Sequence, residues 1–517
     1  MEKNVLEFLE NSQRMYGEKT ACADMNNELT YTQLMNQAKF IGSCLSLKIK
    51  PTQGVPVYMD KTCNTLSLFM GIVYAGGYYC MLDTTHPVER INLILDTIQA
   101  DILVVDNKSA KKAEKLGFQG EIINLDELLE EYDGQAVDSE AQERLEKIRE
   151  QALDTDPLYS IFTSGSTGVP KGVIVNHRST IDFIDCFTET FGITNEDVIG
   201  NQAPFDFDVS VKDIYSSLKT GATLQLIPKM CFSFPTKLLD FLDDRKVTTI
   251  IWAVSALCIV TTLNGFEYKR PSSLNKIMFS GEVMPIKHLN AWRVQYPDAM
   301  FVNLYGPTEI TCNCTYYIID REFGLDEKLP MGKPFANERV FLLDDEDKLV
   351  DAGRPGELGE ICVSGTAVTM GYLRNPEKTA AAFVQNPLND RYLETIYRTG
   401  DLGYYSGELF FSSRKDFQIK HMGHRIELGE IETYMNAIEG LLRSCCIFDT
   451  DENKILGFFE IEGASELDRK GVTHALKDKV PQWMIPNVLV KVETMPITKN
   501  GKIDRKELMK IYKEQEA

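Results

Sequence analysis

One short segment, residues 162–172, carries the side chains best suited to phosphate chemistry. It reads Phe-Thr-Ser-Gly-Ser-Thr-Gly-Val-Pro-Lys-Gly, so three glycines, four hydroxyl residues and one lysine fall within eleven positions. Glycines let the backbone curl until its N–H groups converge on an anion, and the hydroxyls and the lysine add further donors. An apolar run at residues 158–162 predicts a strand leading into the segment. We therefore expect a loop that holds a polyphosphate.

This loop differs from the common P-loop. That motif ends in Gly-Lys followed by Ser or Thr, whose hydroxyl meets magnesium. Here Lys171 is followed by Gly172 and Val173, so a kinase or a GTPase is not favoured. A flexible surface loop rich in glycine and serine is the alternative, and the motifs further along the chain argue against it.

Length and composition indicate an acidic globular protein with two or more domains. The chain has 517 residues, of which 43% are hydrophobic and 25% charged, and these fractions are ordinary for globular proteins. The net charge of −21 disfavours nonspecific binding to nucleic acid or to an anionic membrane. No apolar run approaches the roughly 20 residues of a membrane span, and the first residues do not resemble a signal peptide.

The cysteines favour a reducing environment. Twelve cysteines are scattered without a Cys-x-x-Cys pair, and the chain has only six histidines. A zinc site is therefore not expected, and buried reduced thiols in a cytoplasmic protein are the simplest interpretation.

Strand-like and helical runs alternate between residues 201 and 306. The predicted strands are 223–227, 247–254, 277–280 and 300–304, and the predicted helices are 236–245 and 285–296. This alternation is typical of a mostly parallel α/β sheet, in which ligands bind beyond the carboxyl ends of the strands. The phosphate loop and residues 303–309 both follow predicted strands.

The pattern changes beyond residues 397–401. A short strand at 409–412 and a charged stretch at 414–425 precede a predicted helix at 426–438 and a small α+β unit. We therefore predict an α/β protein with a large N-terminal domain, residues 1–413, built of parallel-rich sheets, helices and a β subdomain. A small mobile α+β domain should follow at residues 414–517.

Seven motifs, taken in chain order, resemble those of the adenylate-forming superfamily. They are residues 162–172, 201–211, 303–309, 356–361, 397–401, 414–432 and 500–505. The resemblance spans nearly the whole chain. It is greatest for amino-acid-adenylating enzymes, a group that includes D-alanine–D-alanyl carrier protein ligases and the adenylation domains of nonribosomal peptide synthetases.

The resemblance implies a reaction in two steps, with ATP and Mg²⁺ as cofactors. A small amino acid attacks the α-phosphate of ATP through its carboxylate, which gives aminoacyl-AMP and pyrophosphate. The phosphopantetheine thiol of a carrier protein then takes the aminoacyl group. Because no Gly-Gly-x-Ser carrier motif follows Arg505, we expect a separate carrier protein as partner.

The resemblance also implies individual roles in the nucleotide site. Tyr305 would stack on adenine, Thr308 would contact the α-phosphate, and Glu309 would hold magnesium. Asp401 would accept hydrogen bonds from the ribose hydroxyls, with Arg414 beside it. A turn or cap role is the structural alternative for Thr308 and Asp401. The full ATP set is Thr163, Ser164, Gly165, Ser166, Thr167, Gly168, Lys171, Gly281, Glu282, Tyr305, Asp401 and Arg414.

Lys502 is the implied catalytic lysine, acting with Thr308 and Glu309. It would bridge the substrate carboxylate and the α-phosphate as negative charge builds there. The C-terminal domain would swing it in for adenylation and out for thiol transfer, with Asp416 as the hinge. In the rotated state residues 414–432 would face the active site, and Gly423 would leave room for the pantetheine arm.

Asp208 favours amino acids over fatty or aryl acids as substrates. A carboxylate buried in an acid-binding pocket is reasonable if the substrate carries an α-ammonium. Asp206 is a nearby rival, and a strand-end cap is the structural alternative. The other implied pocket residues are Val209, Lys212, Ser255, Met278, Ser280, Leu304, Cys312 and Asn313.

Two pocket positions depart from D-alanine ligases. Ser280 stands where those enzymes usually carry cysteine, and Lys212 stands where an apolar residue is typical. Ser255, Ser280 and Asn313 could instead hydrogen-bond a small polar side chain such as that of serine or threonine. We expect Lys212 to point to solvent, and pairing with an acidic substrate side chain is the alternative.

The leading hypothesis is a D-alanine–carrier protein ligase-like enzyme. The alternative is a stand-alone nonribosomal peptide synthetase adenylation enzyme for a small polar L-amino acid. An acyl- or aryl-CoA ligase is disfavoured by Asp208, and a noncatalytic scaffold by the presence of Lys171, Glu309, Asp401 and Lys502. A carrier would dock on a basic patch, for which the candidates are Arg414, Lys415, Lys420, His421, His424 and Arg425.

Overall fold

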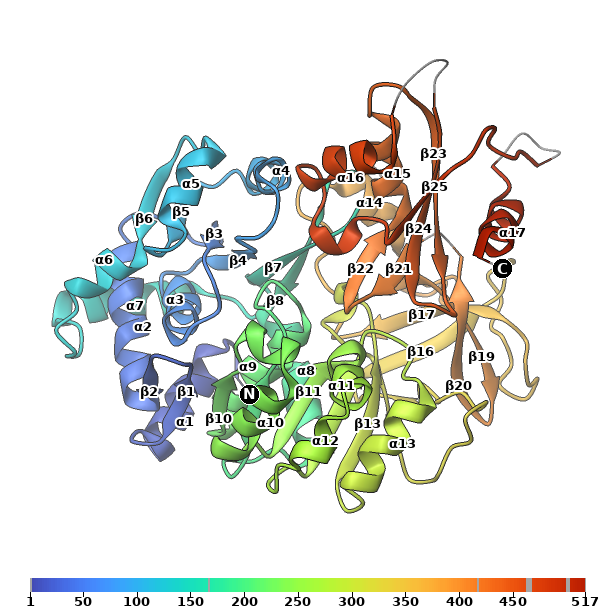
Figure 1. Ribbon diagram of the computed structural model, residues 1–517. Coiled ribbons are helices and arrows are strands. Elements are labelled where there is room, and N and C mark those ends of the chain that lie inside the picture. Colours follow the sequence, from blue (N-terminus) through green and yellow to red (C-terminus); the bar gives the residue numbers. More distant parts are fainter. Residues whose placement is uncertain (1, 166–167, 416–417, 462–466, 499–502, 517) are drawn as a thin grey trace.

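The computed structural model describes residues 2–165, 168–415, 418–461, 467–498 and 503–516 (Figure 1). Two large sheets, both covered by helices, make up most of the N-terminal region, residues 2–415. The C-terminal region, residues 418–516, is orange to red at the upper right of Figure 1 and packs against them. No helix in the described ranges is long and apolar enough to cross a membrane.

A nine-stranded sheet holds the strands predicted between residues 201 and 306. The six central strands, β13, β12, β11, β9, β10 and β1 in spatial order, all pair in parallel. Antiparallel strands lie at the two edges: β2 beside β1, and β14 and β15 beyond β13. The predicted mostly parallel sheet is therefore confirmed. In spatial order the strands are β15 (Lys333–Pro334), β14 (Thr315–Ile318), β13 (Met300–Tyr305), β12 (Lys276–Ser280), β11 (Thr249–Ala253), β9 (Val198–Asn201), β10 (Thr223–Leu226), β1 (Thr20–Ala23) and β2 (Glu28–Thr30).

A six-stranded sheet carries the phosphate loop. Its last two strands pair antiparallel, and the loop joins them, so the predicted strand before the loop is confirmed. The other pairings in this sheet are parallel. In spatial order the strands are β6 (Glu121–Asn124), β5 (Ile102–Val105), β3 (Gly54–Tyr58), β4 (Tyr78–Leu82), β7 (Pro157–Thr163) and β8 (Lys171–Asn176).

Helices cover both sheets. The predicted helices near residues 236–245 and 285–296 are α10 and α13. The helices of the N-terminal region are α1 (Leu6–Tyr16), α2 (Tyr31–Leu45), α3 (Cys63–Tyr74), α4 (Val88–Ile98), α5 (Ala110–Ala113), α6 (Leu125–Glu130), α7 (Ser139–Gln151), α8 (His177–Phe191), α9 (Val209–Thr220), α10 (Pro235–Asp244), α11 (Val254–Thr262), α12 (Gly265–Tyr268), α13 (Ile286–Gln295) and α14 (Pro376–Ala382).

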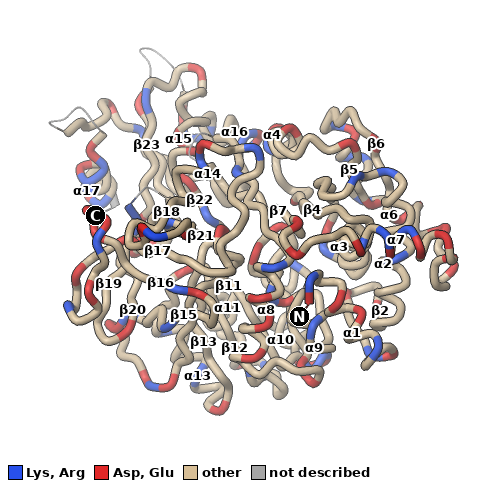
Figure 2. Tube along the Cα trace, turned by 180° about the vertical axis from the view of Figure 1, so that it is seen from behind, with Lys and Arg blue, Asp and Glu red and all other residues tan. Residues whose placement is uncertain are grey.

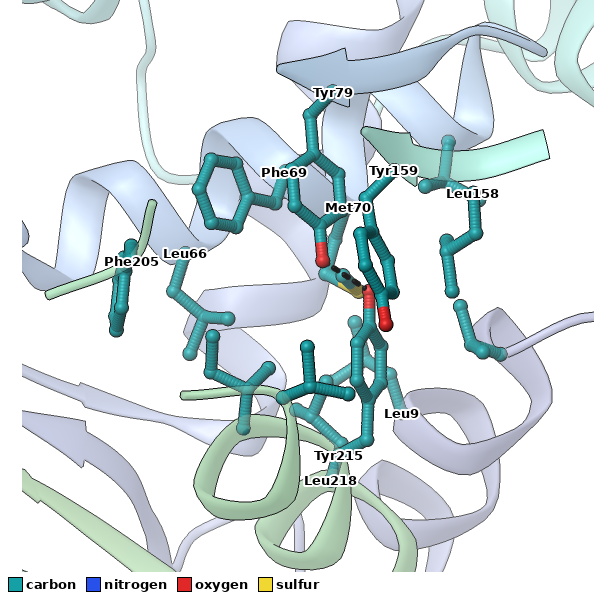
Figure 3. Close-up of a cluster of buried hydrophobic side chains, with 14 of the residues drawn as sticks. Leu9, Leu66, Phe69, Met70, Tyr79, Leu158, Tyr159, Phe205, Tyr215 and Leu218 are labelled. Atoms are coloured by element: carbon teal, nitrogen blue, oxygen red, sulfur yellow. Dashed lines mark hydrogen bonds between the residues drawn. The ribbon is translucent and has the colours of Figure 1, made fainter. Parts of the chain in front are cut away.

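An aromatic core ties the phosphate loop to the predicted amino acid pocket (Figure 3). Tyr159 on β7, the strand that leads into the loop, lies beside Tyr79 and Tyr215. The hydroxyls of Tyr79 and Tyr215 are 2.9 Å apart. Tyr215 belongs to α9, the helix that begins directly after Asp208. Phe205, just before the pocket segment, packs on Phe69 in the same cluster. Buried aromatic contacts therefore fix both parts of the site relative to each other.

The predicted β subdomain is an antiparallel five-stranded sheet. Its strands are β16 (Glu338–Leu343), β17 (Gly359–Gly365), β18 (Phe383–Gln385), β19 (Thr395–Ser406) and β20 (Glu408–Arg414). Arg414 still pairs with Asp401 across β19 and β20. The predicted division between residues 413 and 414 thus falls at the last position of this sheet, and the division itself stays a prediction.

The C-terminal region is a small α+β unit. The helix predicted at residues 426–438 begins two residues late, because Ile426 pairs with Ile419 in the preceding hairpin and is fully buried. The elements are β21 (Gln418–His421), β22 (His424–Glu427), α15 (Leu428–Asn436), β23 (Leu441–Asp449), β24 (Lys454–Ile461), α16 (Arg469–Lys477), β25 (Val488–Lys491) and α17 (Arg505–Glu516).

Charges of both signs are spread over the molecule. Seen from behind, acidic and basic residues are interspersed along the helices and loops (Figure 2).

Candidate active site

The β21–β22 hairpin of the C-terminal region lies against the predicted site. Gly423 at its turn donates its N–H to Glu282 Oε1 over 2.7 Å. Its φ is +80°, and a Cβ at this position would lie 3.2 Å from Cβ of Ala253. Glycine is suited to this left-handed turn and to the close approach. The turn of this hairpin thus reaches the site, and the expectation that residues 414–432 face it in a rotated state stays a prediction.

Part of the phosphate loop binds the hairpin. Ser164 Oγ donates to the carbonyl of Arg425 over 2.7 Å and accepts from the N–H of Glu427 over 3.1 Å. Lys171 Nζ lies 3.6 Å from Glu427 Oε1, and both side chains are largely buried. A carboxylate thus approaches the lysine that the resemblance assigns to phosphate.

A second carboxylate reaches the backbone of the same loop. The N–H of Gly165 donates to Glu430 Oε2 over 3.1 Å. The other oxygen of Glu430 pairs with Arg90, and both side chains are buried. Burial raises the pKa of Glu430, and the charge of Arg90 opposes that rise. Two acidic residues of the C-terminal region, Glu427 and Glu430, therefore lie against donors that the resemblance assigns to phosphate.

Glu309 is fully buried and has a partner on each oxygen. Tyr372 donates to Oε1 over 2.7 Å, and Arg425 pairs with Oε2 at 2.5 Å. Burial alone would raise the pKa of Glu309, but the charges of Arg425 and Lys171 lower it to about 2. An ionised carboxylate is a donor that fits magnesium. In this arrangement, however, Arg425 holds the oxygen that a metal ion would need.

The predicted adenosine residues also lie together. Asp401 accepts from the hydroxyl of Tyr305 and pairs with Arg414 Nη1 at 2.6 Å. The ammonium of Lys420, from the hairpin, lies 5.3 Å from the centre of the Tyr305 ring. A cation therefore rests on the ring that the resemblance assigns to adenine stacking.

One cavity of about 80 Å³ joins the predicted substrate and phosphate residues. Asp208 Oδ2 accepts from Thr308 Oγ1 over 2.7 Å, and burial raises the pKa of Asp208. The hydroxyl of Thr163 lines the same cavity and has no hydrogen-bond partner among the described residues. The predicted residues that line it are Thr163, Ser164, Asp208, Val209, Ser280, Gly281, Thr308, Cys312, Asn313 and Gly423.

Some predicted pocket residues lie behind this lining. Met278 and Leu304 are buried in the strands β12 and β13. Ser255 on α11 contacts the carboxylate of Glu282 through its backbone. Gly168, with φ +80°, accepts a hydrogen bond from Tyr434 through its carbonyl. Ser166, Thr167, Asp416 and Lys502 lie outside the described residues.

The expectation that Lys212 points to solvent is wrong. Its exposed fraction is 0%, and its Nζ donates to Asn313 Oδ1 over 2.6 Å and lies 3.4 Å from Ser280 Oγ. Lys212 follows Asp208 by four positions in α9, so both residues share one face of the helix. This spacing was visible in the sequence and could have predicted that the lysine turns inward.

The proposed basic patch does not form an exposed surface at three of its positions. Lys420 covers Tyr305, Arg425 pairs with Glu309, and the ring of His424 stacks on Trp483 with centroids 3.9 Å apart. These side chains point into the junction between the two regions. Trp483, which also lines the cavity, was not singled out from the sequence, because no local motif marks it.

Asp83, His86 and Asp206 form a further cluster beside the cavity. Their ligand atoms lie within 4.8 Å of one another. Burial lowers the pKa of His86 to about 4 and raises that of Asp206 to about 7. The donor set is one that could hold a divalent cation. Asp206 therefore faces a different group from Asp208, which contacts Thr308.

The fold and this constellation define an adenylate-forming enzyme. The chain belongs to the AMP-binding enzyme family, whose model matches residues 9–373. It is 32% identical to D-alanine–D-alanyl carrier protein ligase of Staphylococcus aureus (strain JH9) over 500 residues, which cover 94% of each protein. It is also 32% identical to zwittermicin A synthase ZmaJ of Bacillus cereus, over 93% of this chain and 90% of that protein. A match to tyrocidine synthase 1 of Brevibacillus parabrevis, at 29% identity, spans 98% of this chain but 45% of the synthase.

Solved structures agree with the predicted fold. The adenylation domain AlmE of Vibrio cholerae, in complex with glycyl-adenosine-5′-phosphate, superposes with a TM-score of 0.84 over 99% of this chain and 98% of that one, at 21% identity. Holo-PA1221, a protein with adenylation and PCP domains, gives a TM-score of 0.82 over 98% and 84%, also at 21% identity. The α/β architecture with a C-terminal α+β unit is thereby confirmed.

Proposed function

We propose that this enzyme activates an amino acid as its adenylate and passes the aminoacyl group to the phosphopantetheine thiol of a separate carrier protein. The observation that carries the proposal is Asp208, a half-buried carboxylate that lines the same cavity as Thr308 and Thr163. A buried carboxylate needs a positive partner, and the α-ammonium of an amino acid supplies one.

In the first step the chain's residues bring together two anions that repel each other, the carboxylate of the amino acid and the α-phosphate of ATP. Asp208 holds the α-ammonium, so the carboxylate of the substrate is directed toward the α-phosphate beside Thr308. Thr163, Ser164, Gly165 and Lys171 bind the outgoing pyrophosphate. Lys502, outside the described residues, bridges carboxylate and α-phosphate. Glu309 would hold magnesium once Arg425 has left its carboxylate, and the ion would supply positive charge beside the phosphates.

In the second step the C-terminal region takes the orientation described above. Pyrophosphate has left, and Glu427 and Glu430 bind the phosphate loop in its place. Gly423 lines the same cavity as Asp208 and Thr308, which supports its role beside the incoming pantetheine arm. The match to a carrier protein ligase over 94% of both chains supports a carrier as the acceptor.

The test is amino-acid-dependent exchange between ATP and pyrophosphate. Asp208→Ala should lose exchange with every amino acid by about 100-fold or more, because the α-ammonium loses a buried counter-charge. Exchange that needs no α-amine, or that is unchanged in Asp208→Ala, would contradict the proposal and point to an acyl- or aryl-CoA ligase.

A further inference from the structure

Resting on the proposed amino acid activation, we propose that Lys212 binds an anionic side chain of the substrate, so that the enzyme prefers aspartate or glutamate to neutral amino acids. This class differs from D-alanine, serine and threonine, which the resemblance and the polar pocket residues favoured. The inference depends on where the Lys212 ammonium lies and on which charges surround it.

The ammonium of Lys212 is buried among neutral partners. Its bonded neighbours are the amide oxygen of Asn313 and the hydroxyl of Ser280, and the residue has no exposed surface. No carboxylate oxygen of the described residues lies within 4.0 Å of its Nζ. Burying a charge without a counter-charge is costly. The site is therefore electrostatically incomplete until an anion arrives.

The two nearest carboxylates, Asp208 and Asp213, are not in ion-pair contact with Lys212, although Oδ1 of Asp213 has no hydrogen-bond partner among the described residues. Asp208 accepts from Thr308 and receives the α-ammonium of the substrate under the proposed function. Asp213 accepts from Asn201 over 2.7 Å, and the same asparagine accepts from Lys61 over 2.8 Å. Burial raises the pKa of Asp213 to about 7 and lowers that of Lys61 to about 7. Once Asp208 meets the α-ammonium, Asp213 is the remaining carboxylate near Lys212, and it forms no ion pair with its Nζ within 4.0 Å.

The ammonium of Lys212 lies behind the cavity wall, next to two residues that form that wall. Asn313 and Ser280, the partners of Lys212, both line the cavity together with Asp208. Asp208 and Lys212 are one helical turn apart, so they lie on the same side of α9. An amino acid bound by its α-ammonium to Asp208 can extend a short side chain toward Lys212. The cavity volume of about 80 Å³ favours a side chain of few atoms.

A neutral isostere provides the sharpest comparison. Asparagine and glutamine match aspartate and glutamate in shape but leave the ammonium without an anion. Leaving a buried charge unpaired costs roughly 2–5 kcal/mol, which corresponds to about 30-fold or more in selectivity. A site in which Lys212 has only a structural role would not separate the acids from their amides in this way.

The experiment measures kcat/KM for ATP–pyrophosphate exchange by the full-length enzyme with both enantiomers of aspartate, glutamate, asparagine, glutamine, alanine, serine and threonine. We expect one acid to exceed its own amide by about 30-fold or more. Lys212→Met, which keeps the length of the side chain without its charge, should bring that ratio close to one. Lys219→Met, on the same helix but bonded to Asp185, is the matched control and should keep the ratio.

The outcomes separate this inference from the proposed function. If alanine, serine or threonine is the best substrate and Lys212→Met leaves the order unchanged, the inference is overturned while amino acid activation stands. If no amino acid supports exchange, the proposed function itself fails. Should Lys212→Met not fold, as judged by its melting temperature, the acid-to-amide ratio of the wild type still decides. Calorimetric binding of the aspartyl and asparaginyl sulfamoyl adenosines gives the same ratio without turnover.

Discussion

Replacing Glu430 by glutamine should separate the two half-reactions. Its carboxylate is fully buried, pairs with Arg90 and accepts the N–H of Gly165. Both partners belong to the N-terminal region, so this charge pair exists only while the C-terminal region is docked. Removing one partner of a buried pair costs about 3 kcal/mol, because the other charge stays buried. That cost is about 150-fold in the docking equilibrium at 25 °C.

The assay compares both steps in Glu430→Gln. ATP–pyrophosphate exchange reports adenylation, and single-turnover transfer from the preformed aminoacyl adenylate to phosphopantetheine reports the thiol step. We expect exchange to be nearly unchanged and transfer to fall by about 100-fold. Glu439→Gln, at an exposed position just after the same helix, is the control and should change neither. Equal losses in both steps, or an unchanged transfer rate, would refute the reasoning.

Three further predictions concern the docked hairpin. Gly423→Val places a branched side chain at φ +80° against Ala253, so thiol transfer should fall while exchange persists; a loss of both would count against this role. Because the pKa of Glu309 is lowered from 4.5 to about 2, its ionised form stabilises the fold above pH 4.5, and this stability is lost as the pH falls toward 2. Urea midpoints between pH 5 and pH 3 should therefore drop less in Glu309→Gln than in the wild type. Magnesium pyrophosphate should slow transfer from the preformed adenylate by competing with Glu427 and Glu430, and an unaffected rate would show that these carboxylates do not share its site.

The sequence predicted the elements that local pattern determines. Apolar runs separated by helical segments predicted where β10 to β13 lie in the chain, since most residues of these strands are buried and the strands so read as continuous apolar stretches. The strand before the loop at residues 164–170 was predictable from its apolar run, whereas the phosphate role of the loop was inferred together with the motifs further along the chain and stays a prediction. Both signals are local in the chain.

The contacts that complete the site are not local. Ser164 and Arg425 are 261 residues apart, and Arg90 and Glu430 are 340 apart. No periodicity or turn signal relates residues at such separations, so the hairpin's charged residues were predicted as an exposed patch. The error at Lys212 is of another kind. Its spacing of four residues from Asp208 would have predicted that the side chain turns inward, but the expectation of solvent exposure took only its charge into account.

The docked arrangement itself implies an order of events. Gly165, Lys171 and Glu309 each have a partner from the C-terminal region, and each is assigned by the resemblance to a phosphate or to the metal that accompanies it. The carboxylates of Glu427 and Glu430 take the place of anionic phosphates, and the guanidinium of Arg425 takes the place of a cation. The pattern of charges around the loop and Glu309 is therefore the same with either set of partners. Two occupants cannot share these donors. Under the proposed function, pyrophosphate and metal must therefore leave before the C-terminal region docks, and a chain that docked early would exclude its own first substrate.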